Sequence, residues 1–375
     1  MKRIILMLMM ATGVMTSLAI TPIDSLELRR LQQMADSVVD EARRLYLYEY
    51  LAWHSADELT KHKVDVKKIG MGGVTVDDNG IMHYIYVDKK GELLLDYVLD
   101  PQSMFSITTT KKRALDNSEM QAMVLRTQAI KTVVETCGDS ILNYSSADGT
   151  LNFDVIPMDN GRLRMYIIQG TTHTDVQPFG NDYVIDLDGK LQVTSFRRLH
   201  NFYIEIPIGN DSNSISHRHA PDSGMITATD IVSFMLYGHD LFGLGSTYVT
   251  FKPHADSEGY VVVFDANRFK AVVMTQGMVE KFVNENKKDN KGITASEDAH
   301  IGDDHGAYFG IETLYQLGTH HRQILPEGGI CYFYKQRLVL DELLAGISAH
   351  GGAGHRLPGV DNPPLQQGRL QPLVA

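Results

Sequence analysis

His217-Arg-His219-Ala-Pro-Asp-Ser-Gly-Met-Ile-Thr227-Ala-Thr-Asp230 is the stretch of this chain that decides most about its middle region. Two imidazoles, one residue apart, are followed by a hydroxyl and a carboxylate at the expected start of a helix. On an extended segment His217 and His219 point to the same side, because strand side chains alternate between faces. With Asp230 they predict three ligands to one zinc ion, which leaves the open coordination position of a catalytic site.

The segments on either side of this stretch alternate between helical and strand-like apolar periods. They predict a mixed α/β (α+β) fold over 111–275, in which a mixed sheet is flanked by helices. The helices are expected at 117–137, ended by Gly138, and at 227–237. The strands are expected near 151–157, 162–169, 183–187, 191–196, 202–208, 247–252, 260–265 and 270–274.

A helix followed by a β-meander is expected over 20–110, in front of that domain. Apolar residues at helical spacing predict a helix over 23–52, and Ser55 and Glu58 have the spacing of a cap on a further short turn. The Asn79-Gly80 pair predicts a tight hairpin turn, and a third strand is expected over 93–99.

The first nineteen residues have the pattern of a secretory signal peptide. Lys2 and Arg3 precede an apolar, Met-rich run that ends at the small-x-small site Ser17-Leu-Ala19. This pattern predicts an exported protein, periplasmic or extracellular, with no membrane span after cleavage. An uncleaved membrane anchor is the alternative, although the apolar run is short for a span.

The residues after 275 have a different composition from the preceding domain. A C-terminal extension is expected over 276–345. The segment 346–375 is rich in Gly, Pro and Gln and has few periodic apolar positions, which predicts a disordered tail.

The formal net charge is −11, and it would become −13 without Lys2 and Arg3. A chain this acidic, with no basic stripe, repels phosphate backbones, so nucleic acid is not an expected partner. Cys137 and Cys331 are the only cysteines. In an oxidising compartment they can pair, or each can be a separate buried thiol.

The order His-x-His, seven residues, a hydroxyl residue, two residues and Asp resembles the JAMM (MPN-type) zinc metallopeptidases, which cut peptide or isopeptide bonds. The resemblance covers about 110–275. It implies that His217, His219 and Asp230 bind zinc and that Thr227 stabilises the tetrahedral intermediate. Glu135, in Val-Glu135-Thr-Cys-Gly138, is similar to the family's general base at the end of a helix.

Some positions depart from the family's pattern. Thr227 stands where the family prefers Ser, Arg218 stands where it has a small residue, and Pro221 lies one residue later than usual. Glu135 is also farther from the histidines along the chain than in the family. Glu205, just upstream of the motif, is therefore an alternative base.

Two functions follow from these patterns. The first is an exported zinc-dependent hydrolase that cleaves an amide bond in a peptide or protein substrate. The second is a non-catalytic secreted or periplasmic binding or structural protein, in which the histidines lie in a loop and Thr227-x-x-Asp230 is an ordinary helix cap. The sequence does not indicate an oligomeric state.

Overall fold

The computed structural model describes residues 22–142, 151–209, 212–220, 224–254, 257, 259–279 and 281. The expected signal peptide, the tail after 345, nearly all of the extension before it and Cys331 lie outside these residues. Cys137 is half-buried on helix α3. None of the described helices is both long and apolar enough to cross a bilayer.

The N-terminal helix α2 (Pro22–Lys61) is longer than the predicted helix. Ser55 does not cap a second turn as expected. Its hydroxyl donates to the carbonyl of Ala52 (3.0 Å) within the same helix and lies 3.2 Å from the Tyr86 hydroxyl. Because this hydroxyl has partners inside the helix and in the core, the helix continues through it.

The β-meander after α2 is a four-stranded antiparallel sheet. The short helix η1 (Val66–Lys68) leads into β1 (Ile69–Val76), β2 (Met82–Asp88), β3 (Leu93–Asp100) and β4 (Phe105–Thr109), which pair in chain order. The predicted hairpin is confirmed. Asp77 accepts hydrogen bonds from the backbone of Asn79 and Ile81 (both 2.9 Å), and Gly80 has φ of +80°. The strand β4 was not predicted.

Helix α3 (Asn117–Leu142) packs on β1 and on a second antiparallel sheet. This sheet has the order β5 (Leu151–Pro157), β6 (Leu163–Gln169), β8 (Tyr183–Leu187) and β9 (Val193–Arg198), and the short helix η2 (Asp159–Gly161) joins its first two strands. The prediction that Gly138 ends α3 was wrong. Gly138 does not adopt a positive φ, so the helix passes through it to Leu142.

The histidine motif belongs to a third sheet. In it β11 (Ser214–Arg218) pairs in parallel with β12 (Ser246–Phe251), and β13 (Tyr260–Asp265) and β14 (Lys270–Thr275) follow antiparallel. Helix α4 (Ala228–Ser233) continues into the π-helical turn η4 (Phe234–Asp240) between β11 and β12. A two-stranded ribbon joins β7 (Val176–Phe179) to β10 (Ile204–Pro207).

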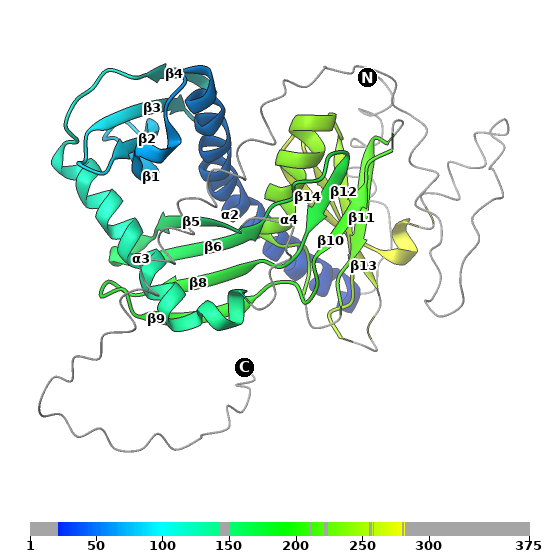
Figure 1. Cartoon of the computed structure of the whole chain (residues 1–375). Helices are drawn as coiled ribbons and strands as arrows, with labels where there is room; N and C mark the ends of the chain where they lie inside the picture. The colour runs from blue at the N-terminus through cyan, green and yellow to red at the C-terminus, as the bar shows by residue number, and fades with distance from the viewer. Residues whose placement is uncertain are drawn as a thin grey trace, which may run out of the picture.

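The described residues therefore have a mixed α/β fold with several sheets; over 111–275 there are three sheets where one mixed sheet was expected. Figure 1 shows α2 running from the meander towards the sheet of β11 to β14. Its buried face shares one hydrophobic core with that sheet and with α4, where Ile231 and Val232 are fully buried. Each such side chain contributes about 1.5–3 kcal/mol. This packing fixes the position of α4, which carries Asp230.

Candidate metal centre

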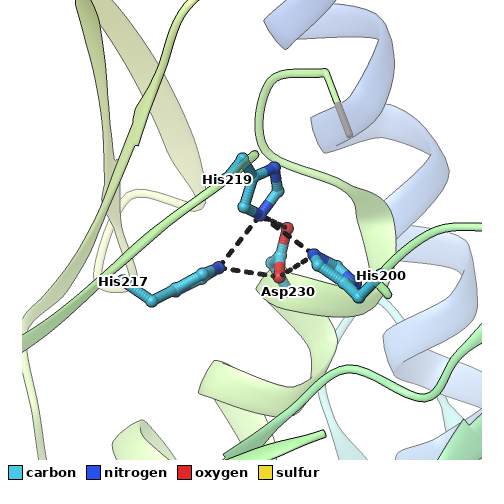
Figure 2. A group of neighbouring side chains, drawn as sticks. All are labelled: His200, His217, His219 and Asp230. Atoms are coloured by element: carbon cyan, nitrogen blue, oxygen red, sulfur yellow. Dashed lines mark hydrogen bonds and ion pairs between the residues drawn. The ribbon is translucent and has the colours of Figure 1, made fainter. Parts of the chain in front are cut away.

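Four buried side chains converge on one point in the structure: His200, His217, His219 and Asp230 (Figure 2). The Nε2 atom of His219 lies 2.9 Å from Nε2 of His200 and 3.0 Å from Nε2 of His217. Oδ1 of Asp230 lies 3.2 Å from Nε2 of His200 and 3.1 Å from Nε2 of His217, and Oδ2 lies 3.3 Å from Nε2 of His219. This group could hold a metal ion.

The spacing of these atoms is close to that of a tetrahedral zinc shell. For Zn–N and Zn–O bonds of about 2.0–2.1 Å, the ligand atoms of a tetrahedron lie about 3.3 Å apart. With Oδ1 as the ligand atom of Asp230, four separations of 2.9 to 3.2 Å come close to this value. Side-chain exposure is 10 % for His200, 4 % for His217 and zero for His219 and Asp230.

Three separate segments bring the four groups together. His217 lies on β11, and His219 follows it with its backbone N–H donating to Thr250 of β12 (2.9 Å), so both rings are on one extended segment as predicted. Asp230 lies in the first turn of α4. His200 comes from the connection between β9 and β10. The ring of His217 also lies against the ring of Phe179, with 4.1 Å between centroids.

Outer partners orient two of the three rings. Nδ1 of His200 donates to the buried carboxylate of Asp182 (2.7 Å), which also accepts from the Thr229 hydroxyl. Nδ1 of His219 donates to the carbonyl oxygen of Gly224 (3.1 Å). An imidazole whose Nδ1 donates in this way presents its Nε2 lone pair to a metal. Two Nε2 atoms only 2.9 Å apart require either a shared proton or a bound metal ion between them.

Two glycines allow these outer contacts. Gly224 has φ of +74°, a conformation that glycine adopts readily and that places its carbonyl near His219. Gly180 has φ of +90°, and a Cβ atom there would come within 1.9 Å of the carbonyl oxygen of Phe202. Only glycine therefore lets the connection that carries His200 pass this close to the end of β7.

Asp230 is both a candidate ligand and a helix cap. Its Oδ2 accepts from the backbone N–H of Thr227 (2.7 Å) and from the Thr227 hydroxyl (2.8 Å), while Oδ1 faces His200 and His217. The Thr227 hydroxyl in turn accepts from the backbone N–H of Asp230 (3.1 Å), which completes a capping box. The cap is compatible with a metal held by Oδ1, because both capping hydrogen bonds go to Oδ2.

The close packing of these groups shifts the pKa values of His200, His217 and Asp230. Burial disfavours charge on His200, but the carboxylates of Asp182 and Asp230 raise the pKa of His200 well above its usual value. Burial lowers the pKa of His217. Burial also opposes the charge on Asp230, yet the three imidazoles hold the pKa of this carboxyl well below its usual range. Asp230 is therefore ionised, as a metal ligand must be.

The residues predicted to act as bases lie outside this group. Glu135 is on α3 with half of its side chain exposed, 3.8 Å from the ammonium of Lys131. Glu205 is on β10, where it accepts from the Thr171 hydroxyl, the Tyr203 hydroxyl (2.7 Å) and Nδ1 of His173 (2.6 Å). Burial opposes the charge on Glu205, but these hydrogen bonds lower its pKa, which makes it a weaker base.

His200 and Asp182 were not among the predicted site residues. Neither belongs to a short motif, because His200 is separated from His217 by a whole strand and its partner Asp182 lies farther upstream. A lone histidine in a loop gives no signal of metal binding. Comparisons with family models, with curated proteins and with solved structures find no match to this chain.

Replacing Asp182 with Asn is expected to weaken metal binding by about 10- to 100-fold, because an amide holds the His200 ring in its binding orientation less firmly. Competition with a chromogenic zinc chelator measures the affinity. Asp186→Asn, which changes a partly exposed carboxylate on β8 paired with Arg164, is the matched control. An unchanged affinity in Asp182→Asn would show that this contact does not support the centre.

Replacing Thr227 with Ala is expected to lower the free energy of unfolding by about 0.5–2 kcal/mol, because the capping hydroxyl is lost. Metal content should stay the same, since the backbone N–H of Thr227 still holds Asp230. Urea unfolding and elemental analysis measure the two quantities. Thr227→Ser keeps the hydroxyl and should behave like the wild type; equal losses in both variants would argue against a capping role.

Proposed function

We propose that this protein binds one zinc ion through His200, His217, His219 and Asp230, and that the ion has a structural role. The observation that carries this proposal is the convergence of four buried ligand atoms, two of them on rings oriented by outer acceptors. Structural zinc sites have four protein ligands, whereas catalytic sites keep one position open. Three imidazole nitrogens and a carboxylate oxygen are a donor set suited to zinc.

The role of the ion follows from the segments that it would join. His200 comes from the β9–β10 connection, His217 and His219 from β11 and its end, and Asp230 from α4. One ion would therefore link a loop, a sheet and a helix that follow one another between residues 200 and 230. Such a link stabilises the folded state, because the assembled site does not exist in the unfolded chain.

Elemental analysis of the purified protein tests this proposal directly. We expect about one equivalent of zinc per chain, and after exchange with Co²⁺ we expect the intense visible absorption of a tetrahedral cobalt site. Protein that contains no zinc above the buffer background, and that takes up none in equilibrium dialysis, would contradict the proposal.

Hydrolysis of an amide bond in a peptide or protein substrate is the second candidate function. One observation favours it: His200 is the most exposed of the four ligands, so its release would open a coordination position next to the motif that resembles the JAMM peptidases. Peptidase and isopeptidase assays of the zinc-loaded protein test it. Turnover that is lost in Glu135→Gln or Glu205→Gln, while zinc is retained, would support a hydrolase and identify its base.

Export is a separate part of the proposal and is supported by the pattern of the first nineteen residues. Cell fractionation and N-terminal sequencing of the mature protein test it. A mature chain that begins after Ala19 is expected. A chain that retains Met1 and stays in the membrane fraction would indicate the uncleaved anchor.

A further inference from the structure

A second polar cluster is buried where α2 faces β5. Glu49 projects from α2, and Asn152 and Asp154 lie on the same face of β5 because they alternate along the strand. Their exposed fractions are 2 %, 6 % and 7 %. Buried acids are rare unless they are paired, so this cluster requires an explanation.

With both carboxyls ionised, three oxygen atoms of this cluster have no hydrogen-bond donor: Oε1 of Glu49, Oδ1 of Asn152 and Oδ2 of Asp154. The amide Nδ2 of Asn152 donates to Oε2 of Glu49 (3.1 Å), which turns Oδ1 of the same amide towards the remaining acceptors. A proton shared between the two carboxyls would pair two of these oxygens and leave the amide oxygen of Asn152 without a donor. A cation can contact all three oxygens at once.

The three side chains line a cavity together with Tyr48, Tyr84 and Arg126 among others. The cavity has a volume of about 10 Å³, roughly that of one water-sized sphere. It therefore has room for a monatomic ion without its hydration shell. Mg²⁺ usually keeps several waters, whereas Ca²⁺ accepts carboxylate and amide oxygens in flexible geometry.

We propose that Glu49, Asn152 and Asp154 form a binding site for a hard divalent cation, Ca²⁺, separate from the histidine centre. Oε1 of Glu49, Oδ1 of Asn152 and Oδ2 of Asp154 supply three oxygens, fewer than the six to eight that Ca²⁺ prefers, because Oε2 of Glu49 already accepts from Asn152. The half-buried guanidinium of Arg126, which donates to the carbonyl of Phe153 (3.0 Å), also repels a cation. The expected dissociation constant is therefore weak, about 10⁻⁴–10⁻³ M.

Tb³⁺ luminescence tests this site in the full-length, zinc-loaded protein. Tb³⁺ replaces Ca²⁺ at oxygen sites, and excitation of Tyr48 and Tyr84 at the cavity should sensitise its emission. We expect saturable emission that millimolar Ca²⁺ displaces and millimolar Mg²⁺ does not. Ca²⁺ alone should raise the melting temperature by roughly 5 °C once it exceeds the dissociation constant by about 100-fold.

Two variants test whether the Tb³⁺ emission comes from this cluster. Glu49→Gln and Asp154→Asn each remove one ligand charge and should weaken Tb³⁺ binding by about 10-fold or more, while both retain one zinc per chain. Glu41→Gln changes a partly exposed glutamate on the same helix, paired with Arg164, and should bind Tb³⁺ as the wild type does. Equal emission from all three variants would place Tb³⁺ elsewhere and overturn the proposal. Zinc content reports on the histidine centre independently.

A shared proton is the competing occupant, and pH separates it from a cation. Burial, and then the charge of Asp154, raise the pKa of Glu49 well above its usual value, and burial also raises the pKa of Asp154. A carboxyl whose pKa is higher in the folded state loses stability as pH rises above its unfolded value of about 4.5. A wild-type protein whose stability falls with pH in this way, with no response to Ca²⁺ or Tb³⁺, would overturn the cation site.

Discussion

Replacing His219 with Ala is expected to abolish stoichiometric zinc binding and to lower the free energy of unfolding by about 3–5 kcal/mol. His219 contributes the fully buried ring whose Nε2 lies close to all three other ligands. Its removal leaves the buried carboxylate of Asp230 with fewer partners and leaves the metal with three ligands. The loss therefore combines the binding energy of the ion with the cost of a poorly compensated buried charge.

Elemental analysis and urea unfolding, each with and without added zinc, measure these two effects. His62→Ala is the matched control, because His62 is exposed in the turn directly after α2 and lies 3.4 Å from Glu58, away from the centre. The wild type should be destabilised by a chelator and His219→Ala should not respond. Equal responses of the two proteins to the chelator would mean that no structural metal is bound at this position.

Replacing His200 with Ala is expected to weaken zinc binding by about 100-fold or more, yet to leave a three-ligand site that still takes up metal at high concentration. Loss of an outer partner of a metal ligand alone costs about 10- to 100-fold, and loss of the ligand should cost at least as much. In the Co²⁺ form, water would take the vacated position. The visible absorption bands should therefore shift, because water replaces an imidazole at a site that stays four-coordinate.

The same variant separates the two candidate functions. If His200 is a permanent fourth ligand, the His200→Ala variant should have a lower zinc affinity and a lower free energy of unfolding, and it should gain no hydrolytic activity. If zinc affinity and the cobalt spectrum stay within about twofold of the wild type, His200 is not a ligand and the centre has the open position of a catalytic site. His173→Ala is the control, since this histidine is exposed and bonded to Glu205 on β10.

Local patterns predicted the parts of the site that lie close together in sequence. Alternation on an extended segment placed His217 and His219 on one side, and the helix-start signal placed Asp230 in the first turn of α4. Both depend on backbone geometry over a few residues. The hairpin at Gly80 was predicted for the same reason.

Two other short sequence patterns, at Ser55 and at Gly138, gave wrong predictions of helix boundaries. Ser55 has the spacing of a cap, but its hydroxyl is satisfied inside α2 and near Tyr86, so no new helix starts there. Gly138 resembles a helix end, yet α3 continues to Leu142. The proposed catalytic role of Glu135 rests on resemblance alone, and its side chain is half exposed beside Lys131.

The sequence by itself determined a pair of imidazoles and a carboxylate with metal-ligand spacing, because strand alternation and helix capping are properties of short segments. Only the tertiary structure decided that His200 joins them and that Asp182 orients its ring, since a loop and a neighbouring sheet must pack together to bring these atoms within hydrogen-bond distance. The same holds for Glu49 and Asp154, whose meeting depends on how α2 crosses β5. Convergence of distant segments is a result of core packing, which no spacing along the chain encodes.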